Sequence, residues 1–151
     1  ALTTKLPTLL VDGNLRSPHL HDLFSCENES GLADAVEGRG IHVHRLPLIP
    51  PADLSLLTAG SSKGHSSVVL SSAKVHELLR HYRCADTRPM IVLDTPALSC
   101  GPDADLLLDG VDAVLLVIRR NYTPLADVTR IMRRIPRQKL LGVIFNGDLP
   151  D

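Results

Sequence analysis

Apolar segments that each end at a polar residue set the main constraint on how this chain folds. TLLVD (8–12), MIVLD (90–94) and LLGVIFN (140–146) are runs of this kind. A strand inside a parallel sheet reads as a continuous apolar run because both of its faces are covered. Helical patterns separate these runs, which is the rhythm of βαβ units. The sequence therefore predicts an α/β fold with a mostly parallel sheet sandwiched by helices.

The expected elements cover most of the chain. Strands are predicted over 8–12, 41–46, 54–58, 90–94, 113–118 and 140–145, and helices over 19–24, 32–36, 72–83, 104–109 and 125–134. The strands near Asp12, Asp94 and Ile118 are expected to be central. The stretch AGSSKGHSS (59–67) is rich in glycine and serine, which favours a flexible surface loop. A chain of 151 residues has room for one well-packed domain, so a single domain over 1–151 is predicted.

Composition narrows the classes of function. The net charge is −1, and the chain has two phenylalanines and no tryptophan, which argues against a module that binds nucleic acid by base stacking. The three cysteines form no CxxC pair, which favours a reducing, cytosolic setting. No apolar run approaches the roughly 18 residues of a membrane span, so any membrane contact is expected to go through a partner.

Three polar residues follow predicted strands at the points where ligands bind. In an open parallel sheet the ligand site lies at the carboxyl ends of the strands. Asp12, Asp94 and Asn146 occupy such ends. Two acids in apolar surroundings suggest a shared Mg²⁺, which takes few carboxylates together with water and phosphate oxygens. The alternative is that each carboxylate caps the following turn or helix. For Asp12 the capping and the metal-binding interpretations are equally favoured.

The motifs around these residues resemble one known family. LLVDGNLRSPHLHDLF (9–24), followed by GLADAVEG (31–38), is similar to the pattern VDxDxRxPxxHxxF…GLxDxLxG, the Walker A′ segment of bacterial tyrosine kinases (BY-kinases) of capsular and exopolysaccharide biosynthesis. That family lies within the MinD/ParA-like deviant-Walker P-loop nucleoside triphosphatases. IVLDTPAL (91–98) resembles the Walker B strand, and VDAVLLVIRRNYTPLADV (111–128) and LLGVIFN resemble the later segments. The likeness runs from about Leu9 to Asn146.

The resemblance implies a P-loop-type fold with a site for ATP and Mg²⁺. It also implies a tyrosine kinase that phosphorylates neighbouring subunits of a homo-oligomer. Its partner would be a transmembrane polysaccharide co-polymerase, a chain-length regulator. The expected location is cytoplasmic, peripheral to the inner membrane through that partner.

The same resemblance assigns roles to residues. Asp12 would bind the metal or act as the base near the tyrosine hydroxyl, and Asp94 would bind Mg²⁺ directly or through water. Asn14 would lie beside the cofactor. Arg16 would hold the loop or meet a neighbouring subunit, the alternative being a solvated surface arginine. Asn146 would approach the adenine, and a simple turn at the end of a strand is equally favoured.

Two departures from the family pattern bear on activity. Asn14 stands where the family usually has a second aspartate, and no GxxxxGK(S/T) motif occurs among the 151 residues. Without that motif nothing cradles the phosphates, so the fold is expected to be incomplete at its N-terminus, with further residues preceding Ala1. The C-terminal tyrosine cluster of the resembled family does not occur among these 151 residues, where Tyr82 and Tyr122 are the only tyrosines. Enzymatic activity is left open, and the alternatives are a non-catalytic regulatory or scaffold paralogue and a ParA/MinD-type positioning ATPase.

Overall fold

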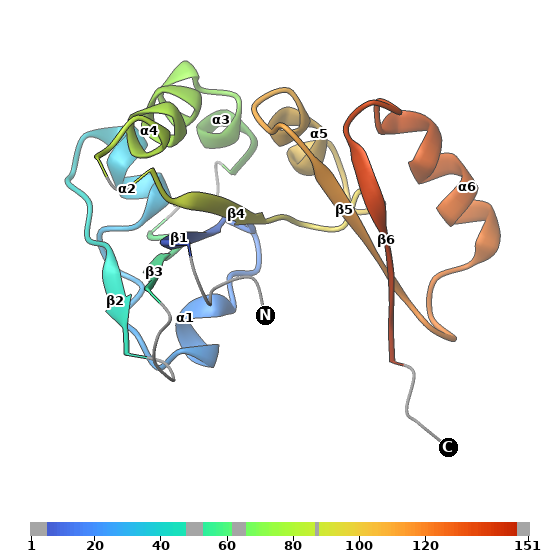
Figure 1. The fold of residues 1–151 in the computed structure, drawn as a ribbon, viewed down its shortest axis with the longest axis horizontal. Helices are drawn as coiled ribbons and strands as arrows, with labels where there is room; N and C mark the ends of the chain where they lie inside the picture. The colour runs from blue at the N-terminus through green and yellow to red at the C-terminus, as the bar shows by residue number, and fades with distance from the viewer. Residues whose placement is uncertain (1–5, 48–52, 62–65, 87, 148–151) are drawn as a thin grey trace. The chain divides into compact units, whose positions relative to one another are not determined.

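The computed structural model describes residues 6–47, 53–61, 66–86 and 88–147 (Figure 1). The chain divides into two compact units, Ala1–Pro96 and Ala97–Asp151. The expectation of one domain over 1–151 stays a prediction. The mostly parallel sheet with flanking helices is the α/β architecture that the apolar runs predict.

The first unit is built on a four-stranded sheet in the order β2-β3-β1-β4. Its strands are β1 (Thr8–Asp12), β2 (His44–Leu46), β3 (Leu54–Leu57) and β4 (Met90–Asp94). β1 runs parallel to both β3 and β4, and β2 runs antiparallel to β3. Leu9 and Val11 of β1 are buried, as expected of an apolar strand with a neighbour on each side.

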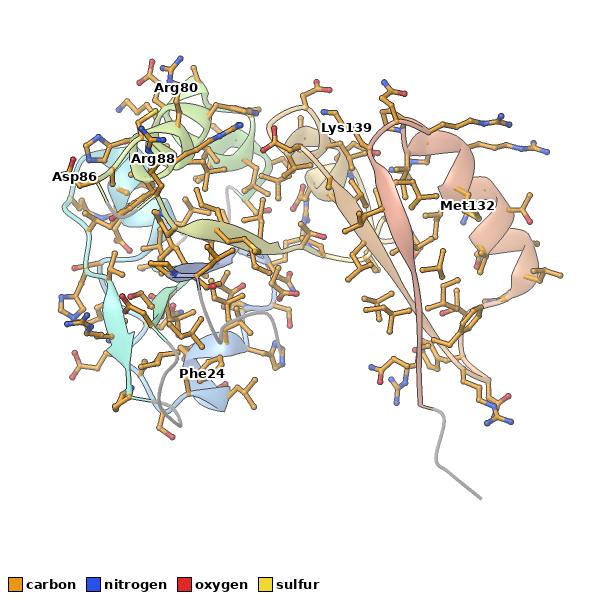
Figure 2. The ribbon with its side chains drawn as sticks, in the orientation of Figure 1. Phe24, Arg80, Asp86, Arg88, Met132 and Lys139 are labelled. Atoms are coloured by element: carbon orange, nitrogen blue, oxygen red, sulfur yellow. The ribbon has the colours of Figure 1, made fainter. Side chains whose placement is uncertain are left out.

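Helices lie on both faces of this sheet. In Figure 1, α2 (Leu32–Glu37), α3 (Ser66–Leu70) and α4 (Ala73–Arg83) gather on one side, and α1 (Leu20–Leu23) lies on the other. The hydroxyl of Ser72 accepts the N–H of Lys74 at 3.3 Å and so begins α4. On the α1 side, a cluster of apolar side chains joins the helix to the strands: Leu46, Leu54 and Leu56, with Leu10, Leu20, Phe24 and Cys26 packed against them. Phe24 is labelled in Figure 2.

The second unit is a two-stranded parallel sheet with two helices. It contains α5 (Asp103–Leu108), β5 (Val114–Arg119), α6 (Leu125–Arg134) and β6 (Leu140–Asn146). Its core gathers apolar residues from the sheet and both helices: Leu98, Ala104, Ile131 and Ile135, with Leu108, Val114, Leu116 and Leu140 against them. Lys139, labelled in Figure 2, donates from Nζ to the backbone oxygen of Leu108 at 2.7 Å and ties the start of β6 to the end of α5.

Four local expectations are corrected by the structure. The strand predicted over 41–46 is shorter, His44–Leu46, and antiparallel. The stretch predicted as a surface loop contains the start of α3, where Ser66 is buried; residues 62–65 lie outside the described ranges. β4 and β5, predicted to be central, are edge strands among the described residues, whereas β1 and β3 each have partners on both sides.

Helix length bears on membrane contact. No helix within the described ranges is both long and apolar enough to cross a bilayer. The longest of these, α4, has 11 residues. At about 1.5 Å per residue such a helix reaches roughly half of the ~30 Å hydrocarbon core.

Candidate functional site

Asp12 and Asp94 lie side by side at the carboxyl ends of two parallel strands. β1 and β4 are paired in register from Thr8 with Met90 to Asp12 with Asp94. The backbone hydrogen bonding between the two strands continues one residue further, because the N–H of Gly13 donates to the backbone oxygen of Asp94 at 2.8 Å. In-register neighbours on parallel strands project their side chains from the same face, with the strands about 4.8 Å apart. The structure therefore brings the two predicted acids together.

The carboxylate of Asp12 also caps the turn that follows it. Asp12 is fully buried. Its Oδ1 accepts the N–H of Asn14 at 3.1 Å, and its Oδ2 accepts the N–H of Leu20, the first residue of α1, at 3.2 Å. A carboxylate has about four acceptor positions, so these two bonds leave capacity for a cation. The capping interpretation holds, and it does not exclude the metal-binding one.

Asp94, unlike Asp12, is exposed to solvent, and its pKa is raised. Its side chain is exposed. Partial desolvation, and then the negative charge of Asp12, raise the pKa of Asp94 above its ordinary value, while His19 and the N–H of Thr95 act against that rise. Two carboxylates that repel one another are stabilised by a shared cation.

Asn14 and Arg16 lie in the loop between β1 and α1, directly after Asp12. The side-chain oxygen of Asn14 accepts the N–H of Ser17 at 3.4 Å and tightens the loop. The Nη2 of Arg16 donates to the hydroxyl of Ser67 on α3 at 3.0 Å. This contact spans 51 positions of sequence and ties the loop to a helix. The roles of Asn14 and Arg16 toward a cofactor stay predictions.

Asn146 belongs to the other unit. It is the last residue of β6 and pairs in register with Arg119 of β5. Its backbone oxygen accepts the N–H of Arg120 at 2.9 Å, and its side chain is exposed. These contacts describe a strand-end turn, and the predicted approach of Asn146 to the adenine stays a prediction.

The donor chemistry of the acid pair fits Mg²⁺. Within the described ranges, no group of three or more His, Cys, Asp or Glu side chains is gathered as a metal cage. Asp12 and Asp94 thus offer two carboxylates and no soft ligand. Mg²⁺ commonly uses one or two carboxylates and completes its octahedron with water and phosphate oxygens. The pair therefore fits this ion better than it fits Zn²⁺, which favours nitrogen and sulfur ligands.

Asp34 organises the end of the neighbouring strand β3. It lies in α2 and not at a strand end, so it was not among the predicted site residues. Its buried carboxylate accepts the N–H of Gly31 at 3.0 Å and of Ser61 at 2.9 Å, and the guanidinium of Arg39 donates to its Oδ1 at 2.8 and 2.9 Å. Burial alone would raise the pKa of Asp34, but the bonds from Ser61, Arg39 and Gly31 outweigh it and lower the pKa below its ordinary value. An acid at the third position of a helix, after glycine, is the signal that points to such a cap.

The N-terminus of α2 is thereby held against the chain that leaves β3. The N–H groups of Leu32 and Ala33 donate to the backbone oxygens of Thr58 and Ala59, each at 2.9 Å. A methyl group at position 31 would overlap the backbone of this segment, so only glycine fits there. The contacts hold the N-terminus of α2 against the segment that follows β3, the strand that pairs with β1.

Comparisons with known proteins bear on this arrangement. No protein-family model matches the chain. It is 28% identical over 145 residues to the putative tyrosine-protein kinase CapB of Staphylococcus aureus, and 29% identical over 141 residues to the tyrosine-protein kinase YwqD of Bacillus subtilis. The matches cover 92% of this chain but 61% and 59% of those proteins, so the chain spans about three fifths of the length of these relatives.

Solved structures give the same result. The kinase domain of VpsO matches with a TM-score of 0.85 and 31% identity, over 98% of this chain and 73% of that one. The kinase domain of the Escherichia coli tyrosine kinase ETK matches with a TM-score of 0.81 and 25% identity, over 93% of this chain and 55% of that one.

Proposed function

The chain belongs to the family of bacterial tyrosine kinases, and from that premise we propose that it forms the ATP- and Mg²⁺-binding part of a protein-tyrosine kinase. We place this kinase in the assembly of capsule or exopolysaccharide. The relative named CapB and the putative tyrosine-protein kinases EpsB of Ralstonia support the proposal by their names.

One observation carries the proposal: Asp12 and Asp94 are register partners at the carboxyl ends of parallel strands. Two adjacent carboxylates, one of them fully buried, repel each other in the absence of a cation. A site that tolerates this repulsion is suited to an ion that removes it. A bound Mg²⁺ would neutralise charge on the phosphate oxygens of the nucleotide.

The residues of this chain would then divide the work. Asp94, which is exposed, would reach the ion directly or through water. Asp12 is held in one orientation by the N–H groups of Asn14 and Leu20, so it would present a fixed oxygen to the ion or accept the proton of a substrate tyrosine. Arg16 would steady the loop through Ser67 or meet a neighbouring subunit, and Asn146 would approach the adenine.

The proposal extends to partners and location. A tyrosine kinase of this family would act with a transmembrane polysaccharide co-polymerase and in a homo-oligomer, on the cytoplasmic side of the inner membrane. Co-purification of the kinase with that partner from membranes would support this assignment, and a purely cytosolic fraction would contradict it.

The central experiment is Mg²⁺-dependent binding of ATP by the full-length gene product, measured by titration calorimetry. We expect Asp94→Ala to abolish the Mg²⁺ dependence because it removes the exposed ligand. Asp86→Ala is the matched control, since Asp86 is an exposed acid outside the site. Equal Mg²⁺-dependent binding by wild type and Asp94→Ala would overturn the proposal, as would the absence of binding by wild type.

A second candidate function rests on Asn14. This residue stands where the family pattern has an acid, which favours a non-catalytic regulatory or scaffold protein of the same fold. Because the side-chain oxygen of Asn14 accepts the N–H of Ser17, an aspartate there could keep this bond. If the scaffold function holds, Asn14→Asp should bind Mg²⁺ more tightly while phosphotransfer to tyrosine stays absent in both proteins. Phosphotransfer by the wild type would exclude the scaffold function.

A further inference from the structure

The hydroxyl of Thr58 is buried and lacks a partner. Thr58 directly follows β3 and is fully shielded from solvent. Its Oγ1 makes no hydrogen bond to any described residue. Burying a hydroxyl without a partner costs free energy, so an unpaired group in a native fold calls for an explanation such as a bound water or ion.

The register of the sheet sets Thr58 beside Asp12. The last paired residues of β1 and β3 are Val11 and Leu57. One residue further along the chain come Asp12, which ends β1, and Thr58, which directly follows β3. Because Asp12 is paired with Asp94 on its other side, the three residues form one row across three parallel strand ends.

Packing places the side chains of this row on one face. Leu10 of β1 and Leu56 of β3 both belong to the apolar cluster that contains Leu20 of α1. Side chains two positions apart on a strand point to the same face. Asp12 and Thr58 each lie two residues beyond these leucines, so both belong to the α1 face of the sheet.

We propose that Thr58 is a positioning residue of the cation site: its hydroxyl hydrogen-bonds a water molecule in the coordination shell of the divalent cation held by Asp12 and Asp94. This inference rests on the function proposed above. Mg²⁺ usually keeps several of its waters when it binds protein. A hydroxyl both donates and accepts, so it suits such a water without adding a third negative charge to a row that already holds two carboxylates.

Two simpler roles predict different behaviour. If Thr58 only packs its methyl group, removing the hydroxyl leaves cation binding unchanged. If its hydroxyl binds a permanent buried water that stabilises the fold, removing it lowers the melting temperature of the cation-free protein. In the proposed role the hydroxyl lacks a partner until the cation arrives, so its removal raises that melting temperature.

The test uses Mn²⁺ in place of Mg²⁺ and counts free Mn²⁺ by electron paramagnetic resonance during titration of the full-length protein. Thr58→Val removes the hydroxyl and nearly keeps the shape, and Thr58→Ser keeps the hydroxyl. We expect Thr58→Val to weaken Mn²⁺ binding about tenfold, the scale of outer-shell effects on metal affinity, and Thr58→Ser to stay within about twofold of wild type. Without Mn²⁺, Thr58→Val should melt at a higher temperature than wild type.

The outcomes separate this inference from the proposed function. Asp94→Asn reports on the site itself and should lose Mn²⁺ binding. If Asp94→Asn loses binding but Thr58→Val binds within about twofold of wild type, the role of Thr58 is overturned and the acid pair stands. The role also fails if Thr58→Val melts at a lower temperature, or if Thr58→Ser binds as weakly as Thr58→Val. If the wild-type protein binds no Mn²⁺, both the cation site at Asp12 and Asp94 and the role of Thr58 are overturned.

Discussion

Asp12 and Asp94 are register partners on neighbouring parallel strands, yet Asp12 is fully buried and Asp94 is exposed. The buried partner is fixed by two backbone N–H groups, and the pKa of the other is raised by partial desolvation and then by the negative charge of Asp12. One acid is thus held in place and the other is free to meet a ligand. This asymmetry leads to the first prediction.

Asp94→Asn should stabilise the cation-free protein at pH 7. The folded state raises the pKa of Asp94 above its ordinary value of 3.8, so ionisation of Asp94 lowers stability as the pH rises through the shifted value. We expect a gain in melting temperature of about 1–3 °C at pH 7, where the side chain is charged, and none below pH ~3.8. Thermal melts at both pH values check this, with Asp86→Asn as the control. A lower melting temperature for Asp94→Asn at pH 7 would contradict it.

Asp34→Ala should be among the most destabilising single changes in the first unit. It would leave the N–H groups of Gly31 and Ser61 without their carboxylate acceptor, the first of them buried, and would remove one acceptor of the Arg39 guanidinium, which keeps Glu37 and the backbone oxygen of Ser61. The expected loss is about 2–4 kcal/mol in the free energy of unfolding. Urea denaturation measures it.

The control for Asp34→Ala is Asp53→Ala. Asp53 pairs with Arg45 at 3.5 Å, and both side chains are exposed, so its loss should cost less than about 0.5 kcal/mol. Similar losses in the two variants would show that the buried network contributes no more than a surface ion pair.

The carboxylate of Asp34 should also make the free energy of unfolding depend on pH. Because the pKa of Asp34 is lowered in the folded state from its ordinary 3.8, its contribution is fully present above that value and is lost as the pH falls through the lower folded pKa. The difference in unfolding free energy between wild type and Asp34→Asn should therefore shrink below pH ~3.8. Urea denaturation at pH 6 and in steps below pH 4 would measure it. A difference that stays constant over this range would exclude the charge as the cause.

Two glycines with the same backbone angle give a matched test of packing at the end of β3. Gly60 and Gly38 both have φ +77°, but a methyl group at position 60 would meet Asp34 and Gly31, and one at position 38 would meet nothing within 4 Å. Gly38→Ala should cost about 1 kcal/mol for the left-handed backbone, and Gly60→Ala at least about 2 kcal/mol more. Denaturant titration of the two variants compares them directly. Equal losses would show that the segment can shift away from α2.

The local sequence was a good guide to elements whose pattern is self-contained. α6 has the predicted bounds, Leu125–Arg134, because the preceding Pro124 supplies a helix start and the apolar spacing supplies a face. β1 and β4 also have their predicted bounds, since a short apolar run that ends at an acid predicts a buried strand with a defined end. α3 was missed because serine and glycine content favours a loop, whereas burial of Ser66, Val69 and Leu70 stabilises a helix there.

The sequence by itself determined the strands, their polar ends and the family likeness, because hydrophobic period and strand-end acids are properties of short segments. Only the tertiary structure decided that Asp12 and Asp94 share one register row, that Asp34 holds the end of β3, and that the hydroxyl of Thr58 is buried without a partner. These facts depend on which strands become neighbours and in what register. Register is set by the packing of whole strands and helices against one another, which brings together residues separated by tens of positions.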